Sequence, residues 1–160
     1  MDLNKLTMGD RVIAVSGIVL FVVSFFNWLG YEADLGPISV SEAASAWDFT
    51  LTLLAVLIGI AMVVLVALKA FGVALPRTVP WGLVLLIMGG VAFAFVLIKL
   101  ITGAGVDTGG VDIDVSKTRE IGIFLGLIAT GGLAAGGYLR FQEEKGASPA
   151  GPPPSAPPTV

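Results

Sequence analysis

The side chains on which most enzyme chemistry depends are missing from this chain of 160 residues. It contains no cysteine and no histidine, which excludes disulfides, zinc thiolate sites, thiol nucleophiles and the commonest general base. No nucleophile and base stand at a usable spacing among the other residues. We therefore expect a protein that is not an enzyme and has no catalytic residue, metal or cofactor. The net charge of −3 gives no basic footprint for nucleic acid.

Three aspartates lie near one another at Asp107, Asp112 and Asp114. Carboxylates are calcium ligands, but this spacing lacks the glycine and the distal glutamate of a calcium loop. We therefore interpret these aspartates as part of a solvated acidic loop and predict no metal site there.

Three other polar residues, Asn27, Asp48 and Lys99, are candidates for a role in or beside a membrane. Lys99 follows Trp81 by about 27 Å of helix at 1.5 Å per residue. We expect it to reach the outer interface as an anchor, and the alternative is a place on an ion path. Asp48 is expected at the positive end of a helix dipole. Asn27 is expected to bond a neighbouring helix.

The composition indicates that membrane helices position these residues. Hydrophobic residues make up 56% of the chain and charged residues 13%, and the mean hydropathy is +0.94, whereas a soluble domain carries about 25% charged residues. A helix crosses a bilayer with about 20 largely apolar residues. Four windows of about this length are expected to span, at residues 12–31, 49–68, 79–101 and 121–139.

The sequence therefore predicts an all-α membrane protein. Residues 1–145 are expected to form a bundle of four transmembrane helices joined by short outer loops. The first window is longer than the apolar core of a cleaved signal peptide, so we expect it to remain as a span. Six of the nine prolines fall in residues 146–160, and we expect this Pro-rich tail to be disordered and cytoplasmic.

Short patterns predict structure outside the spans. Residues 111–115 alternate apolar and acidic side chains with the period of a strand, and we expect them to pair with residues 35–40 in a small outer cap. Ser39 and Glu42 have the spacing of a capping box, which predicts a short outer helix before the second span. Thr7-x-x-Asp10 has the same spacing before the first span, although Asp replaces the usual Glu or Gln.

The distribution of lysine and arginine indicates the orientation. Six of the nine fall in the N-terminal segment, the second connection and the tail, and three fall near the other two connections. Because positive loops stay in the cytoplasm, we expect a multi-pass protein of the cell membrane with both termini cytoplasmic. The aromatic residues expected at the interfaces are Trp28, Tyr31 and Trp47 outside and Trp81, Tyr138 and Phe141 inside.

Small residues follow one face of the last span, where they allow another backbone to approach closely. We expect this face to pack inside the bundle, with a homo-oligomer seam as the alternative. Shorter small faces at Gly90-x-x-x-Ala94 and Ala55-x-x-x-Gly59 offer partners. The members of the expected packing face are Gly122, Gly126, Ala129, Gly132 and Gly136.

Four features occur together: an aromatic run at residues 24–30, an aromatic–acidic pair at Trp47 and Asp48, Lys99 late in the third span, and glycines over residues 122–138. In this combination the chain resembles a family of uncharacterised four-span integral membrane proteins of actinobacteria. The resemblance covers about residues 9–142. It implies the bundle and its topology, and it implies no activity.

Function is expected to rest on contacts. We expect a non-enzymatic scaffold or accessory subunit that acts through helix packing and outer loops. Its partners would be the lipid bilayer and either another membrane protein or a second copy. The alternative is a small transporter or channel subunit, although four spans line a pore only as an oligomer and no inverted repeat is seen.

Overall fold

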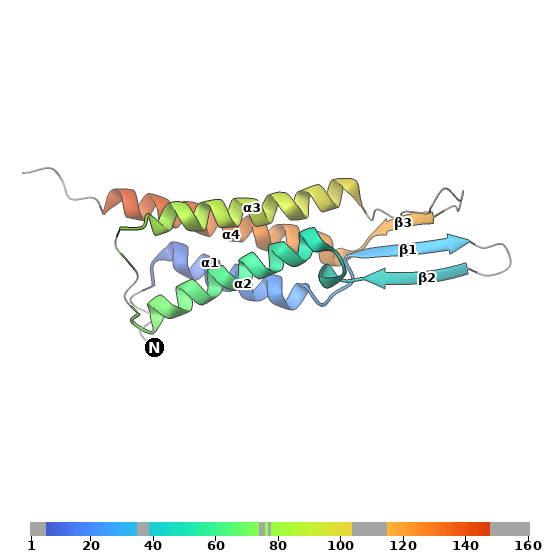
Figure 1. Cartoon of the computed structure of the whole chain (residues 1–160), viewed down its shortest axis with the longest axis horizontal. Coiled ribbons are helices and arrows are strands. Elements are labelled where there is room, and N and C mark those ends of the chain that lie inside the picture. The colour runs from blue at the N-terminus through green and yellow to red at the C-terminus, as the bar shows by residue number, and fades with distance from the viewer. Residues whose placement is uncertain (1–5, 35–38, 74–75, 77, 104–114, 148–160) are drawn as a thin grey trace, which may run out of the picture.

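The computed structural model describes residues 6–34, 39–73, 76, 78–103 and 115–147 (Figure 1). Four helices and three strands make up most of this part of the chain. A short 3-10 turn, η2, precedes the second helix. In chain order the elements are α1 (Met8–Val23), β1 (Leu29–Asp34), β2 (Ser39–Ala44), η2 (Ala46–Asp48), α2 (Thr50–Ala70), α3 (Trp81–Thr102), β3 (Val115–Arg119) and α4 (Ile121–Gly146).

The helices lie side by side, and the sheet projects beyond one end of them (Figure 1). α4 packs against α1 and α3, and α2 packs against the other faces of the same two helices. The starts of α1 and α3 and the ends of α2 and α4 meet at the end opposite the sheet. We call this the basal end, which is marked by Asp10, Lys69, Trp81 and Arg140.

Within the described residues, the three helices α2, α3 and α4 are long and apolar enough to cross a membrane. The three corresponding windows of the sequence are therefore helical, and α4 continues to Gly146, beyond the expected limit at residue 139.

The first expected span is wrong at its C-terminal end. Residues 12–31 were expected to be one helix, but α1 has 16 residues and ends at Val23. Side chains donate hydrogen bonds to carbonyl groups in its last turn: Ser24 Oγ donates to the Phe21 oxygen at 2.6 Å, and Trp28 Nε1 donates to the Val23 oxygen at 2.9 Å. The chain then turns and enters β1 at Leu29.

Four helices form the body of the fold, and the connections at the end opposite the basal end add an antiparallel sheet to them. In the described part of the chain the strand order is β2-β1-β3. Gly30 of β1 stands opposite Ala43 on one side and Thr118 on the other. The expected pairing of residues 111–115 with 35–40 is wrong where it can be followed, because Val115 pairs with Ala33 of β1. Residues 35–38 and 111–114 lie outside the described residues.

The two capping boxes have different outcomes. The one at Thr7 is confirmed: its backbone N–H donates to Asp10 Oδ2 at 3.1 Å, and Asp10 N–H donates to Thr7 Oγ1 at 3.4 Å. The one at Ser39 is wrong, because Ser39 and Glu42 both belong to β2. The short helical turn before α2 is η2, and Ser45 caps it.

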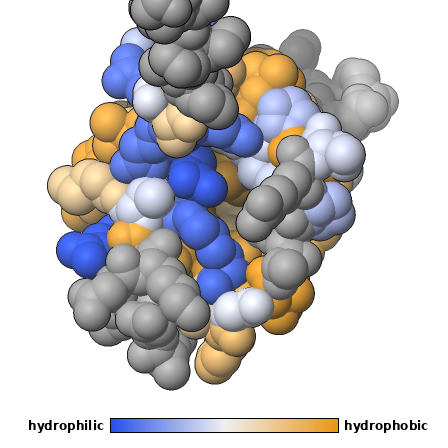
Figure 2. All heavy atoms as spheres, turned by 90° about the vertical axis from the view of Figure 1, so that its left-hand side faces the viewer, coloured by the Kyte–Doolittle hydropathy of each residue, from blue (hydrophilic) through white to orange (hydrophobic). Residues whose placement is uncertain are grey.

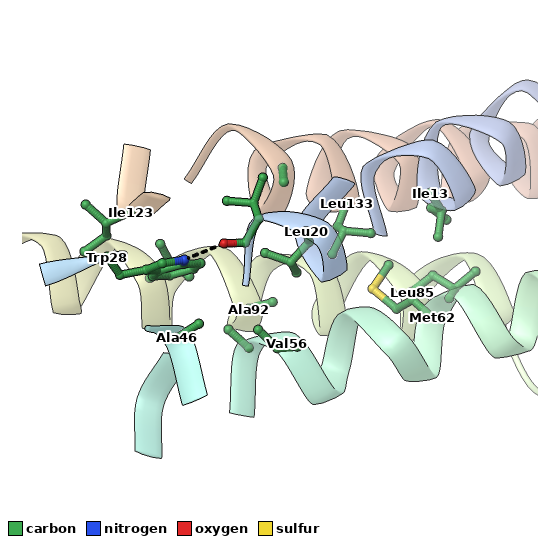
Figure 3. Packing of buried hydrophobic residues seen from close by; sticks show 14 of the residues in the cluster. Ile13, Leu20, Trp28, Ala46, Val56, Met62, Leu85, Ala92, Ile123 and Leu133 are labelled. Atoms are coloured by element: carbon green, nitrogen blue, oxygen red, sulfur yellow. Dashed lines mark hydrogen bonds between the residues drawn. The ribbon is translucent and has the colours of Figure 1, made fainter. Parts of the chain in front are cut away.

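A continuous hydrophobic core runs between the four helices (Figure 3). It begins beside the sheet at Trp28, whose indole donates the hydrogen bond drawn in Figure 3, and continues toward the basal end through Met62. Large apolar side chains also point outward, including Ile128 at 71% exposure. An apolar exterior is what a helix presents to lipid. The fully buried members of the core include Ile13, Leu20, Trp28, Val56, Met62, Ile123 and Leu133.

Candidate functional site

The three polar residues singled out in the sequence have separate contacts at the end of the helices near the sheet. Lys99 Nζ lies 3.8 Å from the centre of the Phe49 ring, a cation–π contact. Asp48 is exposed and accepts hydrogen bonds from the backbone N–H and the hydroxyl of Ser45 at 2.7 and 2.9 Å, so its carboxylate caps η2. The backbone oxygen of Asn27 accepts a hydrogen bond from Gly122 N–H at 3.1 Å, at the start of α4.

The small face of α4 lies against α1 and the turn after it. A Cβ on Gly136 would come within 2.7 Å of Ile13 Cγ1, and one on Gly132 would collide with Ser16 Oγ. Ala129, between these glycines and the outer end, is 3% exposed. This chain's own first helix therefore occupies the face.

The outer part of the same face holds Trp28. Its ring lies where a Cβ on Gly122 or Gly126 would be, and the side chain is 0% exposed. The expectation that Trp28 anchors in the outer headgroup layer is therefore wrong. The missing side chains of the two glycines leave room for the indole inside the protein.

α3 does not pack against its neighbours through the expected pair, Gly90 and Ala94. Gly90 and Ala94 are exposed, and no atom lies within 4 Å of a Cβ placed on Gly90. The contact is made one position earlier, since a Cβ on Gly89 would lie 2.8 Å from the Cα of Ala134 in α4. Gly137 of α4 meets the backbone of α3 in the same way, with 2.7 Å to the Leu85 oxygen.

A cluster of charged residues, which the sequence reasoning did not single out, joins three helices at the basal end. Asp10 of α1 is 1% exposed. Its Oδ2 accepts a hydrogen bond from Lys69 of α2, and its Oδ1 lies 3.5 Å from Nε of Arg140 in α4. The Lys69 and Arg140 side chains are 24% and 21% exposed. A buried carboxylate is tolerated when it is paired and hydrogen-bonded, and Asp10 meets both conditions.

Two consecutive glutamates of α4 connect its C-terminal part to the starts of the neighbouring helices. Glu143 Oε1 accepts a hydrogen bond from Gly9 N–H of α1 at 3.3 Å. Glu144 Oε2 accepts one from Gly82 N–H of α3 at 2.6 Å. A carboxylate at a helix N-terminus also meets the positive end of the helix dipole. With Asp10, Lys69 and Arg140, these residues form what we call the basal cluster, which links all four helices.

A cavity of about 390 Å³ opens beside the basal cluster. α2, α3 and the connection between them supply most of its walls. Figure 2 views this end of the molecule, where hydrophilic residues gather in the middle with hydrophobic residues around them. Its charged lining consists of Asp10, Lys69, Arg140 and Glu144, and its apolar lining of Leu65, Val66, Val73, Pro76, Val79, Trp81 and Leu85.

One signal in the sequence could have located this site. Asp10, Lys69 and Arg140 each lie at the same end of a different expected span, so an up-and-down topology brings them to one level. The sequence analysis used Lys69 and Arg140 only as loop charges for the orientation, and Asp10 as part of a capping box. Two other aromatic residues from the sequence analysis lie at opposite ends of the helices: Trp81 donates to the Pro76 oxygen at 2.9 Å near the basal end, and Trp47 donates to Ser24 Oγ at 3.1 Å near the sheet.

No three histidine, cysteine or acidic side chains gather as a metal site in the part of the chain that the structure describes. Asp107, Asp112 and Asp114 lie outside that part. The chain matches no model of a known protein family, and no curated protein sequence matches it. The resemblance to four-span actinobacterial proteins therefore stays a prediction.

Proposed function

We propose that this chain is a non-enzymatic membrane protein of the cell membrane whose four helices hold an outer sheet in place for contact with another membrane protein or a second copy. The observation that carries the proposal is the basal cluster, which ties all four helices together at the end opposite the sheet. These ion pairs and hydrogen bonds fix the positions of the helices relative to one another. The outer sheet is then the surface through which the protein makes contacts.

The outer surface of α1 supports its assignment as the fourth span. Val15, Ile18 and Val22 are 63%, 57% and 51% exposed, and exposure of a row of large apolar side chains to water is unfavourable. Its 16 residues reach about 24 Å, less than the hydrocarbon core of about 30 Å. The exposed Phe25 and Phe26 extend the apolar surface toward the sheet, and lipid adjusts to a short span at modest cost.

The charges at the basal end support a cytoplasmic location for it. Arg11, Lys69, Arg140 and Lys145 lie in the first turns of α1 or the last turns of α2 and α4. Positive residues concentrate on the cytoplasmic side of membrane proteins. The sheet then faces outward.

The shape of the sheet supports a role in protein contacts. Among the described strands β1 is central, so β2 and β3 each have one edge without a strand beside it. Such an edge presents backbone N–H and C=O groups to which another strand can add. Ser41, Glu42 and Ala43 of β2 are exposed, so this edge is accessible.

Photo-crosslinking in intact membranes tests the proposal. The chain has no cysteine, so Ser41→Cys provides a single attachment point on β2 for a thiol-reactive benzophenone. Ala135→Cys, on an exposed position of α4, is the matched control facing lipid. We expect illumination to give one adduct of defined mass from position 41, either a dimer or a complex with one other protein. Unmodified monomer alone from position 41 would count against the proposal.

The second candidate function, a transporter or channel subunit, is favoured by the cavity at the basal end. In the described part of the chain, the hydrophobic core blocks a path from this cavity through the bundle, because Ile13, Met62 and Leu133 are each 0% exposed. Transport would therefore need an oligomer. Ion flux into liposomes that contain the purified protein, measured with and without Lys99→Met, decides between the two candidates.

A further inference from the structure

The cavity at the basal end has a charged side and an apolar side. Lys69, Arg140 and Glu144 lie on the charged side, and Leu65, Val73 and Val79 belong to the apolar side. Ligand sites in proteins typically have volumes of about 300–1,000 Å³, mostly apolar walls and a few convergent polar groups. At about 390 Å³ this cavity is large enough for a small polar group attached to an apolar one.

Two acids and two bases line the cavity, and both acids already accept hydrogen bonds from other parts of the protein. Asp10 is 1% exposed, whereas Lys69 and Arg140 are 24% and 21% exposed, so the acid lies behind the two bases. Glu144 is already bonded to Gly82 N–H at 2.6 Å. The exposed parts of the two bases therefore favour an anionic group.

Arg140 retains hydrogen-bonding capacity for such a group. A guanidinium has five N–H donors in a planar fork, and its Nε lies 3.5 Å from Asp10 Oδ1. The NH1 nitrogen lies 3.9 Å from Glu143 Oε2, beyond hydrogen-bond length. Arginine and lysine together suit phosphate, which has several oxygens to accept charge-assisted hydrogen bonds.

The position of the cavity indicates where the phosphate comes from. α2 and α3 are apolar enough to span a membrane, and the cavity lies between the end of α2 and the start of α3. In the membrane arrangement proposed above, on which this inference rests, lipid headgroups occupy this level, and basic pockets between membrane helices on the cytoplasmic side bind phosphate-bearing headgroups. We propose that the basal cavity binds the phosphate of one membrane phospholipid between Lys69 and Arg140, with the glycerol end of its acyl chains against the wall formed by Leu65, Val73 and Val79.

Native mass spectrometry of the full chain in a nonionic detergent tests this site. The probes are phosphatidylglycerol, diacylglycerol with the same acyl chains, and inorganic phosphate. We expect one phosphatidylglycerol per chain with saturable binding, and about tenfold weaker binding of diacylglycerol, because charge-assisted hydrogen bonds to the phosphate are lost. Equal binding of the two lipids, or saturation by inorganic phosphate at the concentration that suffices for the lipid, would overturn the proposal.

Variants separate the cavity from the rest of the lipid-facing surface. Val73→Trp fills the cavity and leaves the ion pairs of the basal cluster in place, and we expect at least about tenfold weaker phosphatidylglycerol binding. Phe71→Trp is the control, since Phe71 is 68% exposed and is not part of the lining. Lys69→Gln should weaken binding and Lys69→Arg should preserve it. The proposal is wrong if Val73→Trp and Phe71→Trp bind the lipid equally well.

Discussion

Replacing Asp10 by Asn should destabilise the protein more than any exposed charge substitution. The carboxylate is 1% exposed, accepts from Thr7 N–H at 3.1 Å, and is paired with Lys69 and Arg140. The amide oxygen of Asn can still accept from Thr7, but two cations lose their shared counter-ion. Removal of one partner from a buried ion pair costs about 3–5 kcal/mol. Because water reaches a fifth to a quarter of both bases, we expect a loss below that range, about 2–3 kcal/mol.

Thermal unfolding in detergent, followed by tryptophan fluorescence to which the buried Trp28 contributes, measures this loss. We expect the Tm of Asp10→Asn to fall by roughly 5–10 °C. Glu42→Gln, an exposed carboxylate of β2, is the matched control and should unfold like the parent protein. Lys69→Gln combined with Asp10→Asn should regain part of the loss, because the remaining Arg140 lies 3.9 Å from Glu143. If Asp10→Asn and Glu42→Gln unfold at the same temperature, the basal cluster does not stabilise the fold and our reasoning is wrong.

Three further predictions concern the helix contacts. Gly126→Leu should push against the Trp28 ring and cost about 1–3 kcal/mol; Leu127→Ile is its control, and unfolding curves that coincide would exclude the expected contact. Gly89→Leu should destabilise the α3–α4 contact, whereas Gly90→Leu, in open space, should leave the unfolding temperature nearly unchanged; the reverse order would contradict the packing. Glu144→Gln should lower stability by about 0.3–1 kcal/mol at low ionic strength through the weaker cap of α3, and this difference should shrink in high salt; a loss that is independent of salt would argue against the dipole contribution.

The apolar windows predicted α2, α3 and α4 because membrane helices need only length and hydrophobicity. The end of α1 was not predicted, because Leu29, Tyr31 and Ala33 continue the apolar run of the helix and alternate with more polar neighbours for only six residues. An alternation of apolar and polar residues over so short a stretch is as typical of the end of a membrane span as of a strand. Only the hairpin with β2 and the pairing with β3, distant in sequence, make it a strand.

The candidate site shows the same limit. The glycine periodicity of α4 was visible in the sequence, but the neighbour that fills it was not, since Trp28 lies about a hundred residues earlier. The basal cluster depends on contacts between residues that are far apart in the sequence, by 59 positions for Lys69 and Asp10 and by 134 for Gly9 and Glu143. Composition and local spacing hold no information on such pairs. The expected up-and-down topology does hold such information, because it brings the starts of the first and third spans to the same level as the ends of the second and fourth.

The most direct test of the four-span arrangement is the accessibility of both ends of α1. Met8 is 65% exposed at its start, Ser41 is exposed on β2 beyond its end, and Ala147 follows α4. Single cysteines at these positions can be labelled on intact cells with a thiol reagent that does not cross membranes. We expect position 41 to react at once, and positions 8 and 147 to react only after the cells are opened. Labelling of positions 8 and 41 from the same side would show that α1 does not span the membrane and would contradict the proposed arrangement.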